Sequence, residues 1–345
     1  MKKIFWIVSA FTLLTMTAFA KPLGNGPLKW EVNNDTLFID DFTISFQRTL
    51  RIPVDGKQYP LPPGLGKLPL YRVEDYASKL PKEWVEQGGV FMPMYQREAM
   101  WISFGGENWR PRAVKIGVGK INVLTGDPWT PDLKQQKDQD YLVAPKPQPW
   151  IDGIKAGKDF IRQFIAMPLG KGVTVEGQIT GKETEGGLQI TLYDPKKGIF
   201  KKPAPSRAKK EGAGFGKSYK MMAPSAAPVE ATQMGLGAGG KMRQKIYPDP
   251  YGFNTWYLKK FGTLYVHIVN STQFEKITGQ KPPDTPITKK DYVLYNYPWF
   301  DLYDEKYADI NASEKLKKIE PVKEKKEESI KVKKTIKYKM PKEKL

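Results

Sequence analysis

The stretch that most constrains the fold is residues 88–126. Apolar residues alternate with polar or small ones from Val114 to Val118, and after a phase slip at Gly119-Lys120 the alternation resumes at Ile121. A period of two is typical of a strand with one buried face, and a glycine at a phase slip suggests a bulge. This stretch therefore predicts a long, bulged strand.

A second strand is expected at residues 100–104, and a turn region containing Gly, Asn and Pro joins it to the first. Together the two predict a β-meander with large aromatic side chains. Further strands are expected at 36–39, 42–52, 160–167, 173–175, 188–193 and 262–270. A helix is expected at 73–87, interrupted by Pro81.

Composition favours the same fold class. The chain has 31 Gly and 29 Pro, which indicates many turns between short elements. We therefore predict a mainly β, sandwich-like body, made of one large or two small domains with few short helices. In this interpretation the body consists of residues 21–195 and 233–311.

The near absence of Cys and His excludes several chemistries. The chain has no cysteine, so disulfides, thiolate nucleophiles and zinc–thiolate sites are excluded. Its single histidine, His267, cannot form a multi-histidine metal site, and its place in a strand favours a packing role. No metal and no cofactor are expected.

Residues 1–20 are typical of a secretory signal peptide. Lys2 and Lys3 precede a short apolar run, and Ala18-Phe19-Ala20 forms an A-x-A cleavage signal. Cleavage after Ala20 would leave no transmembrane anchor. The sequence thus predicts export to the periplasm or the extracellular space.

The positive charge is concentrated in two segments. The chain has a formal net charge of +19. Residues 196–220 contain nine basic residues and one acid, and residues 312–345 contain thirteen lysines and six glutamates. We predict a flexible basic loop at 196–232 and a disordered tail at 312–345. These appendages favour an anionic envelope or wall polymer as partner, whereas a nucleic-acid groove in the body is not indicated.

The glycine-rich segment Gly235-Leu-Gly-Ala-Gly-Gly-Lys241 matches two nucleotide-binding patterns in part. Met242 stands where a P-loop needs Ser or Thr, and no apolar strand precedes the segment. We therefore expect a glycine loop beside a strand and no nucleotide.

Three Arg/Gln pairs lie within apolar segments and are candidate binding residues. A buried guanidinium needs a carboxylate or carbonyl partner, so the pairs and nearby carboxylates could line a polar pocket for an anionic or hydroxylated ligand. Alternatively, each pair is the solvent-facing half of an alternation, which we favour. The candidates are Gln96, Arg97, Glu98, Asp152, Arg162, Gln163, Arg243 and Gln244.

Tryptophans near turns supply further candidates, among them Trp101 and Trp109. Exposed aromatic side chains on a β scaffold can stack on sugar rings, although they also serve as packing residues. A glycan hydrolase would add a carboxylate pair, for which Asp301, Asp304 and Glu305 are candidates.

Several sequence blocks resemble an uncharacterised family found in bacteria and fungi, some of whose members carry a ubiquitin-like insertion. The blocks are GGVFMPMYQREAMWISF (88–104), AVKIGVGKINVLTG (113–126), QDYLVAPKPQPWIDGI (139–154), IRQFIAMPLGKGVTVEGQITG (161–181), MGLGAGGKMRQKIY (234–247) and YPWFDLYDE (297–305). The resemblance covers residues 52–305 and implies no particular activity.

Three functions remain open at this stage. The first is a non-enzymatic binding or structural protein of the cell envelope, held to anionic surfaces by its basic appendages. The second is a carbohydrate-binding protein or glycan hydrolase. The third is a secreted effector that acts on host membranes.

Overall fold

The computed structural model describes residues 30–202, 233–258, 262–294, 297–301, 308–323, 330, 332 and 335–337. The expected signal peptide, residues 1–20, lies outside them, as do most of the expected basic loop and most of residues 324–345. The described chain is mainly β, with a large antiparallel sheet and few short helices, which confirms the predicted fold class.

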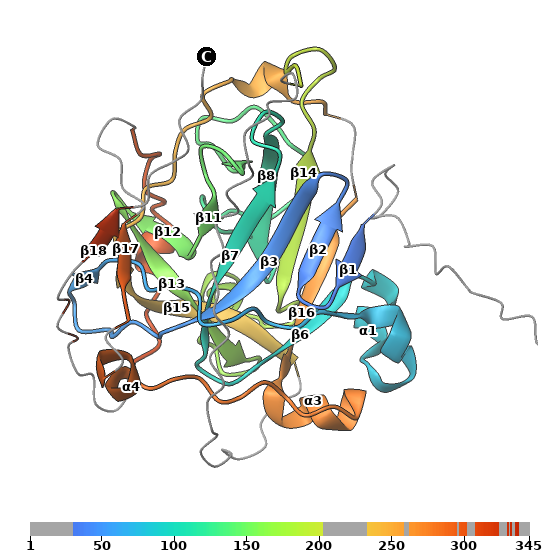
Figure 1. Ribbon diagram of the computed structural model, residues 1–345, viewed down its shortest axis with the longest axis vertical. Coiled ribbons are helices and arrows are strands. Elements are labelled where there is room, and N and C mark those ends of the chain that lie inside the picture. Colours follow the sequence, from blue (N-terminus) through green and yellow to red (C-terminus); the bar gives the residue numbers. More distant parts are fainter. Residues whose placement is uncertain are drawn as a thin grey trace, which may run out of the picture.

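Sixteen of the described strands form one sheet, whose strand order differs from the order of the chain (Figure 1). Its main path is β1 (Glu31–Asn33), β2 (Thr36–Ile39), β3 (Phe42–Thr49), β7 (Ala99–Gly106), β13 (Phe160–Pro168), β15 (Gln233–Met242), β16 (Leu264–Asn270), β14 (Leu188–Tyr193), β8 (Arg112–Val118) and β10 (Leu142–Ala144). Six strands pair beside this path: β4 (Gln58–Tyr59), β5 (Tyr71–Arg72), β6 (Val90–Met94), β9 (Ile121–Asn122), β11 (Trp150–Ile151) and β12 (Gly153–Gly157). Strands from both sides of residues 196–232 pair with one another, so this segment interrupts the sheet.

A second, two-stranded sheet joins β17 (Trp299–Asp301) to β18 (Thr335–Lys337) in parallel. The helices of the described chain are short. They are the 3₁₀ helices η1 (Val73–Lys79), η2 (Phe253–Thr255) and η3 (Leu316–Lys318), and the α-helices α1 (Lys82–Gln87), α2 (Val175–Thr180), α3 (Ser271–Thr278) and α4 (Lys289–Leu294). Pro81 separates η1 from α1, as expected for a residue that cannot donate a helix hydrogen bond.

The strand expected at residues 173–175 is wrong. Thr174 is the N-cap of α2, and its hydroxyl accepts a hydrogen bond from the Gly177 N–H at 3.0 Å. The two flanking valines favoured a strand in the sequence. A threonine in extended conformation at a helix start also satisfies a backbone donor, and this local contact decides the conformation.

The predicted β-meander is also wrong, because β7 and β8 are not neighbours in the sheet. β7 pairs with β3, β11 and β13, whereas β8 pairs with β9, β10 and β14. Residues 107–111 carry the chain from one side of the core to the other. β7 and β8, although consecutive in sequence, thus contribute to the core from separate parts of the sheet.

The phase slip at Gly119-Lys120 is a tight turn and not a bulge. Val118 pairs with Ile121 in antiparallel register, so only two residues connect β8 to β9. Both have positive φ, 53° at Gly119 and 56° at Lys120. Positive φ at both central residues defines the type I′ turn, whose twist matches that of the flanking strands.

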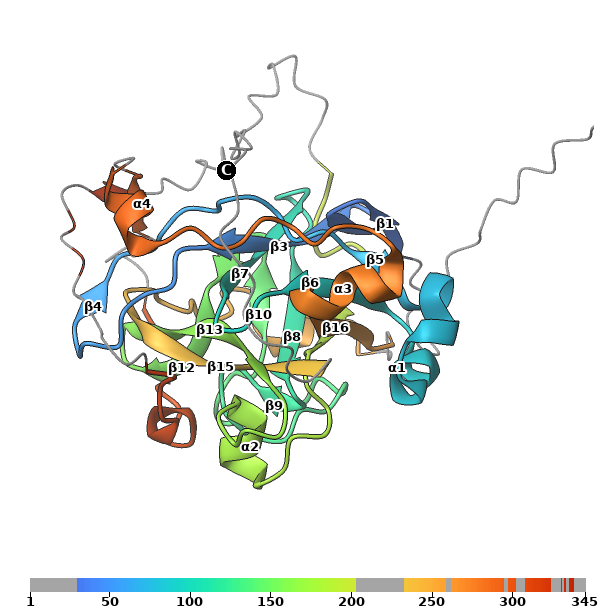
Figure 2. The same cartoon turned by 90° about the horizontal axis from the view of Figure 1, so that it is seen from below.

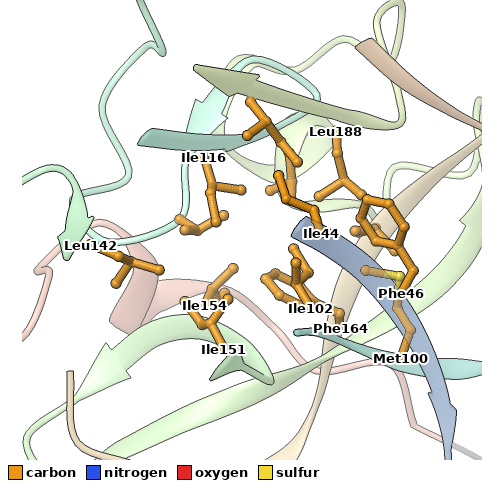
Figure 3. Packing of buried hydrophobic residues seen from close by; sticks show 14 of the residues in the cluster. Ile44, Phe46, Met100, Ile102, Ile116, Leu142, Ile151, Ile154, Phe164 and Leu188 are labelled. Carbon is orange, nitrogen blue, oxygen red and sulfur yellow. The ribbon is translucent and has the colours of Figure 1, made fainter. Parts of the chain in front are cut away.

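The sheet curls around a single large apolar core. Side chains from opposite parts of it point into one common region, as Figure 3 shows for Ile44, Phe46, Met100, Ile102, Ile116, Leu142, Ile151, Ile154, Phe164 and Leu188. Each of these is at most 1% exposed. Burial of one such side chain stabilises the fold by about 1.5–3 kcal/mol.

The glycine-rich segment at 235–240 is a strand, which overturns the expected glycine loop. It forms most of β15, between β13 and β16. At Gly240 an added Cβ would lie 2.2 Å from the Pro53 carbonyl oxygen, so the glycine lets a neighbouring segment approach the strand. The geometry of a phosphate-binding loop before a helix is therefore absent at this position.

The body extends beyond the expected boundary at residue 311. Residues 308–323, here called the strap, lie along the body, where η3 is seen in red below β12 in Figure 2. Leu316, Ile319 and Val322 are buried. These three residues are spaced three apart among many lysines. Because the prediction relied on the lysine-rich composition, it set the start of the tail too early.

A buried ion pair fixes the start of the strap. The Asp309 carboxylate accepts hydrogen bonds from the Lys155 ammonium, from the Asp159 N–H at 2.7 Å and from the Ile246 N–H at 2.9 Å. The Lys155 and Asp309 side chains are 0% and 3% exposed. Burial lowers the pKa of Lys155, and the Asp309 charge opposes that shift.

Candidate functional site

The glutamines of two Arg/Gln pairs are buried and bind the chain itself. Gln163 accepts a hydrogen bond from the Ile52 N–H and donates one to the Leu50 carbonyl oxygen, both at 2.8 Å. Gln244 accepts from the Asp152 N–H at 3.1 Å and donates to the Asp152 carboxyl at 2.9 Å. Neither glutamine is exposed to solvent, so the expectation that each pair faces solvent is wrong for them. They satisfy buried backbone groups between segments that are distant in sequence.

The arginines of the three pairs do not converge on one site. Arg97 is exposed in the turn before β7, with φ +66°, and Gln96 beside it is half-buried. Arg243 is exposed just after β15. Arg162 is half-buried and lines a small cavity. Solvent exposure thus holds for Arg97 and Arg243, and Arg162 is the candidate that remains for ligand binding.

Glu98 and Asp152 are both buried carboxyls with internal partners. Glu98 accepts from Arg48 Nε at 2.5 Å and from the Tyr95 N–H at 2.8 Å, and burial raises its pKa. Burial raises the pKa of Asp152 to about 8, while its hydrogen bond from Gln244 opposes the shift. Asp152 is thus a neutral carboxylic acid at neutral pH, enclosed in the body.

The tryptophans do not form an extended platform. Trp129, Trp256 and Trp299 are buried, and Trp109 is half-buried between β7 and β8. Trp101 and Trp150 are half-buried neighbours, with ring centroids 6.0 Å apart. The side chain of Asp301, and all of Asp304 and Glu305, lie outside the described residues. The glycan hypothesis therefore gains no support from these aromatic residues.

His267 is a packed residue of β16. Its ring stacks on Trp84 at 4.4 Å, and Nε2 lies 3.0 Å from the Gly88 carbonyl oxygen. Burial lowers its pKa to about 4. Trp84 belongs to a second apolar cluster, formed where α1 and α3 lie beside β6 and β16 (Figure 2). The expected packing role of His267 is confirmed.

The described residues contain neither a cluster of metal-binding side chains nor a membrane-spanning helix. No group of three or more His, Asp or Glu side chains among them is placed to hold a metal ion. Within that same part of the chain, no helix has the length and apolar character needed to span a membrane.

A surface feature lies at the start of the predicted basic loop, and its pairing with residues 251–258 was not predicted from the sequence. The segment before residue 202 is held to residues 251–258: the Lys196 N–H donates to the Thr255 carbonyl oxygen and the Tyr257 N–H to the Asp194 carbonyl oxygen, at 2.8 and 2.9 Å. The two paired segments lie at the top of Figure 1 and carry exposed apolar and basic residues. We call the following residues the basic corner: Lys196, Lys197, Ile199, Lys201, Lys202, Tyr251, Tyr257 and Leu258.

All eight residues of the basic corner are exposed. Ile199 is 51% and Leu258 48% exposed, and the two tyrosines are 38–40% exposed. None of the four lysines forms an ion pair within the described chain. The signal in the sequence was the placement of Ile199 between two Lys-Lys pairs.

The acids nearest to the basic corner point inward. Asp194 pairs with Arg112 Nε at 2.6 Å and with Arg110 at 3.2 Å. Asp249 accepts hydrogen bonds from the Tyr141 hydroxyl at 2.7 Å and from the Trp256 ring N–H at 2.8 Å. Because both carboxylates are engaged inside the body, neither forms an ion pair with a lysine of the corner.

Comparison with known proteins supplies no relative. No family model, no curated protein and no solved structure matches the chain. The resemblance noted in the sequence stays a prediction, and the function must be argued from the geometry.

Proposed function

We propose that this protein is a non-enzymatic binding protein of the cell envelope, which attaches peripherally to an anionic lipid surface through the basic corner. The observation that supports the proposal is the combination of exposed apolar side chains with four lysines that form no ion pair with any described residue. Export through the signal peptide at 1–20 belongs to the same proposal, because it would bring the protein to the envelope.

A lipid surface fits the corner better than a purely polar polymer does. Lysines near an anionic leaflet contribute about 1 kcal/mol each, and this attraction decays within a Debye length. Tyrosine side chains suit the membrane–water interface, where one end is apolar and the other hydrated. Ile199 and Leu258 would add apolar contacts with the lipid, which a polyanion alone does not provide.

The sequence adds charge next to the corner. Arg207, Lys209, Lys210, Lys217 and Lys220 follow Lys202, and Lys259 and Lys260 follow Leu258. Since like charges that are close in sequence act together on an oppositely charged surface, these residues would reinforce the proposed attachment.

The test is sedimentation of protein 21–345 with lipid vesicles. Vesicles containing phosphatidylglycerol are compared with pure phosphatidylcholine vesicles, at about 0.1 M and about 1 M salt, where the Debye lengths are about 10 and about 3 Å. We expect binding to the anionic vesicles alone, and its loss at high salt.

Two variants locate the binding surface. Replacing Lys196, Lys197, Lys201 and Lys202 by Gln should weaken binding about 100-fold or more. Replacing Lys82, Lys276, Lys281 and Lys290 by Gln removes equal charge from exposed positions elsewhere and is the matched control. Equal losses in the two variants, or binding to isolated cell-wall polymer but not to vesicles, would contradict the proposal.

A further inference from the structure

A small cavity lies on another part of the molecule, where the end of β15 meets the strap. It has a volume of about 260 Å³. Arg162 of β13, Lys241 of β15 and Lys323 of the strap line it, together with backbone near Pro53 and Gly240. Three cationic side chains from three separate segments therefore surround one hollow.

The polar groups of Arg162 are poorly satisfied within the described chain. Its Nε is buried and has no hydrogen-bond partner, and its Nη1 lies 3.5 Å from the Gly239 carbonyl oxygen, at the limit of a hydrogen bond. Burial lowers the pKa of Arg162, while the charge of the exposed Glu320 opposes that shift. An unsatisfied buried guanidinium N–H costs free energy unless a ligand or solvent accepts from it.

The other charged groups leave the cavity positive. Lys241 Nζ lies 5.3 Å from the centre of the Phe160 ring, and Lys323 is exposed and forms no ion pair with a described residue. The nearby Asp55 accepts a hydrogen bond from the Tyr59 hydroxyl at 2.6 Å. Glu320 forms no ion pair with Arg162.

The larger hollow of the described surface does not show this pattern. It has about 810 Å³ and is open, and Lys79 and Glu183 line it. Lys79 Nζ donates to the Ile277 carbonyl oxygen at 3.0 Å, and Glu183 accepts from the Thr174 N–H and hydroxyl at 2.9 and 2.6 Å. Both charged groups are engaged by the chain itself, whereas in the smaller cavity Arg162 Nε has no hydrogen-bond partner and Lys323 forms no ion pair among the described residues.

We infer that the cavity between β13, β15 and the strap is a binding site for a phosphate group. The planar guanidinium of Arg162 would donate to phosphate oxygens, and Lys241 and Lys323 would supply point charges from two other directions. The volume is below the about 300–1,000 Å³ of typical drug-sized ligand sites, so the site fits a phosphate with only a small attached group.

The strap contributes to this site and is itself held nearby. The Val322 N–H donates to the Ala238 carbonyl oxygen at 2.8 Å, and Arg51 donates to the Val322 carbonyl oxygen at 2.5 Å. A phosphate bound by Lys323 and Arg162 would join the strap to β13. By linkage, the ligand stabilises the docked strap and the docked strap strengthens ligand binding.

This site is independent of the basic corner, so the two proposals can fail separately. The phosphate site is tested by calorimetric titration of protein 21–345 with inorganic phosphate and with glycerol 3-phosphate. The ionic strength is kept constant with chloride. We expect saturable binding of one ligand per chain, with glycerol 3-phosphate at least as tight as phosphate.

The variants Lys323→Gln and Lys241→Gln should each weaken binding about tenfold, because each removes one charge-assisted contact. Both residues are solvent-accessible, so the fold should tolerate the changes, whereas Arg162→Gln is the more severe variant. Lys276→Gln, on α3, is the control and should bind as the unchanged protein does. Unchanged affinity in the Lys241→Gln/Lys323→Gln double variant, or heat signals that chloride reproduces, would overturn the inference.

The source of the phosphate is distinguished with the corner variant that lacks Lys196, Lys197, Lys201 and Lys202. If this variant still binds phosphatidic acid vesicles, and Lys323→Gln removes that binding, the site takes a lipid headgroup. If it binds glycerol 3-phosphate but no vesicle, the site takes a soluble or polymer-linked phosphate. Both results support a phosphate site, and binding of neither ligand refutes it.

Discussion

Four lysines lie in the strap, residues 308–323, and four lie in the basic corner. In the strap, Leu316, Ile319 and Val322 are buried between them, whereas Ile199 of the corner is 51% exposed. The strap also has a carboxylate, Asp309, that meets a buried lysine, while the corner has none. The comparison shows that lysine content does not decide whether a segment belongs to the body. The spacing of its apolar residues and the presence of an internal charge partner do.

The change with the largest expected effect is Asp309→Ala in the strap. It leaves the buried Lys155 without its partner, and removal of one member of a buried ion pair costs about 3–5 kcal/mol. Urea unfolding followed by tryptophan fluorescence measures the loss. Removing one charged side chain from the corner, with Lys197→Ala, should leave the free energy of unfolding within about 0.5 kcal/mol of that of the unchanged protein. Equal effects would remove the distinction between the two segments.

The apolar residues of the two segments sharpen the comparison. Leu316→Ala removes a fully buried side chain beside Gly126 and should destabilise the fold by about 3 kcal/mol. Ile199→Ala should change stability by less than about 0.5 kcal/mol but weaken vesicle binding. Thermal unfolding and vesicle sedimentation of both variants give the two readouts. A stable Leu316→Ala variant would show that the strap is not part of the cooperative fold.

The body and the corner should also differ in their response to pH. The pKa of Asp152 is about 8 in the folded protein and about 4 unfolded, so the folded state binds the extra proton between these values. Stability should therefore fall as pH rises towards 8, by up to about 1 kcal/mol per pH unit. His267, with a lowered pKa of about 4, has the opposite effect below its unfolded pKa of about 6.5. The window between about 6.5 and 8 therefore lies above the range in which His267 contributes.

The free energy of unfolding of the Asp152→Asn variant, measured across the same pH window, checks this pH dependence. The amide can accept from Gln244 as the protonated acid does, so the variant should fold and lose the decline in stability across that window. Vesicle binding by the corner should not change across this window, because Asp152 is buried inside the body and is not part of the corner. A wild-type slope that persists in Asp152→Asn would assign the pH dependence to another group.

The smallest effect is expected at the surface of the strap. Lys315 Nζ lies 2.5 Å from the Asp127 carboxylate, but the two side chains are 55% and 48% exposed. Exposed ion pairs contribute about 0–1 kcal/mol, so Lys315→Gln should shift the urea midpoint only slightly. A loss as large as that of Leu316→Ala would mean that charge, and not apolar packing, holds the strap.

Part of the fold could be read from local patterns. The strands expected at 36–39 and 188–193 correspond to β2 and β14, the alternation from Val114 to Val118 lies in β8, and Pro81 breaks the helix where expected. The positions of Gln163 and Gln244 were also found, but not their roles. A polar residue within an apolar segment indicates that its side chain has a specific hydrogen-bond partner. The partner itself could not be predicted, because it is a backbone group dozens of residues away in the sequence.

From the amino-acid sequence alone we could establish that the chain is mainly β and cysteine-free, and that its charge is concentrated in two segments. These properties are local, because they depend on composition and on the alternation of neighbouring residues. The three-dimensional structure was needed to show that β7 and β8 are not neighbours and that the glycine-rich segment is a strand. It was also needed to show that Arg162, Lys241 and Lys323 line one cavity. Strand pairing and side-chain convergence join residues far apart in sequence, and they follow from how the whole sheet encloses its core.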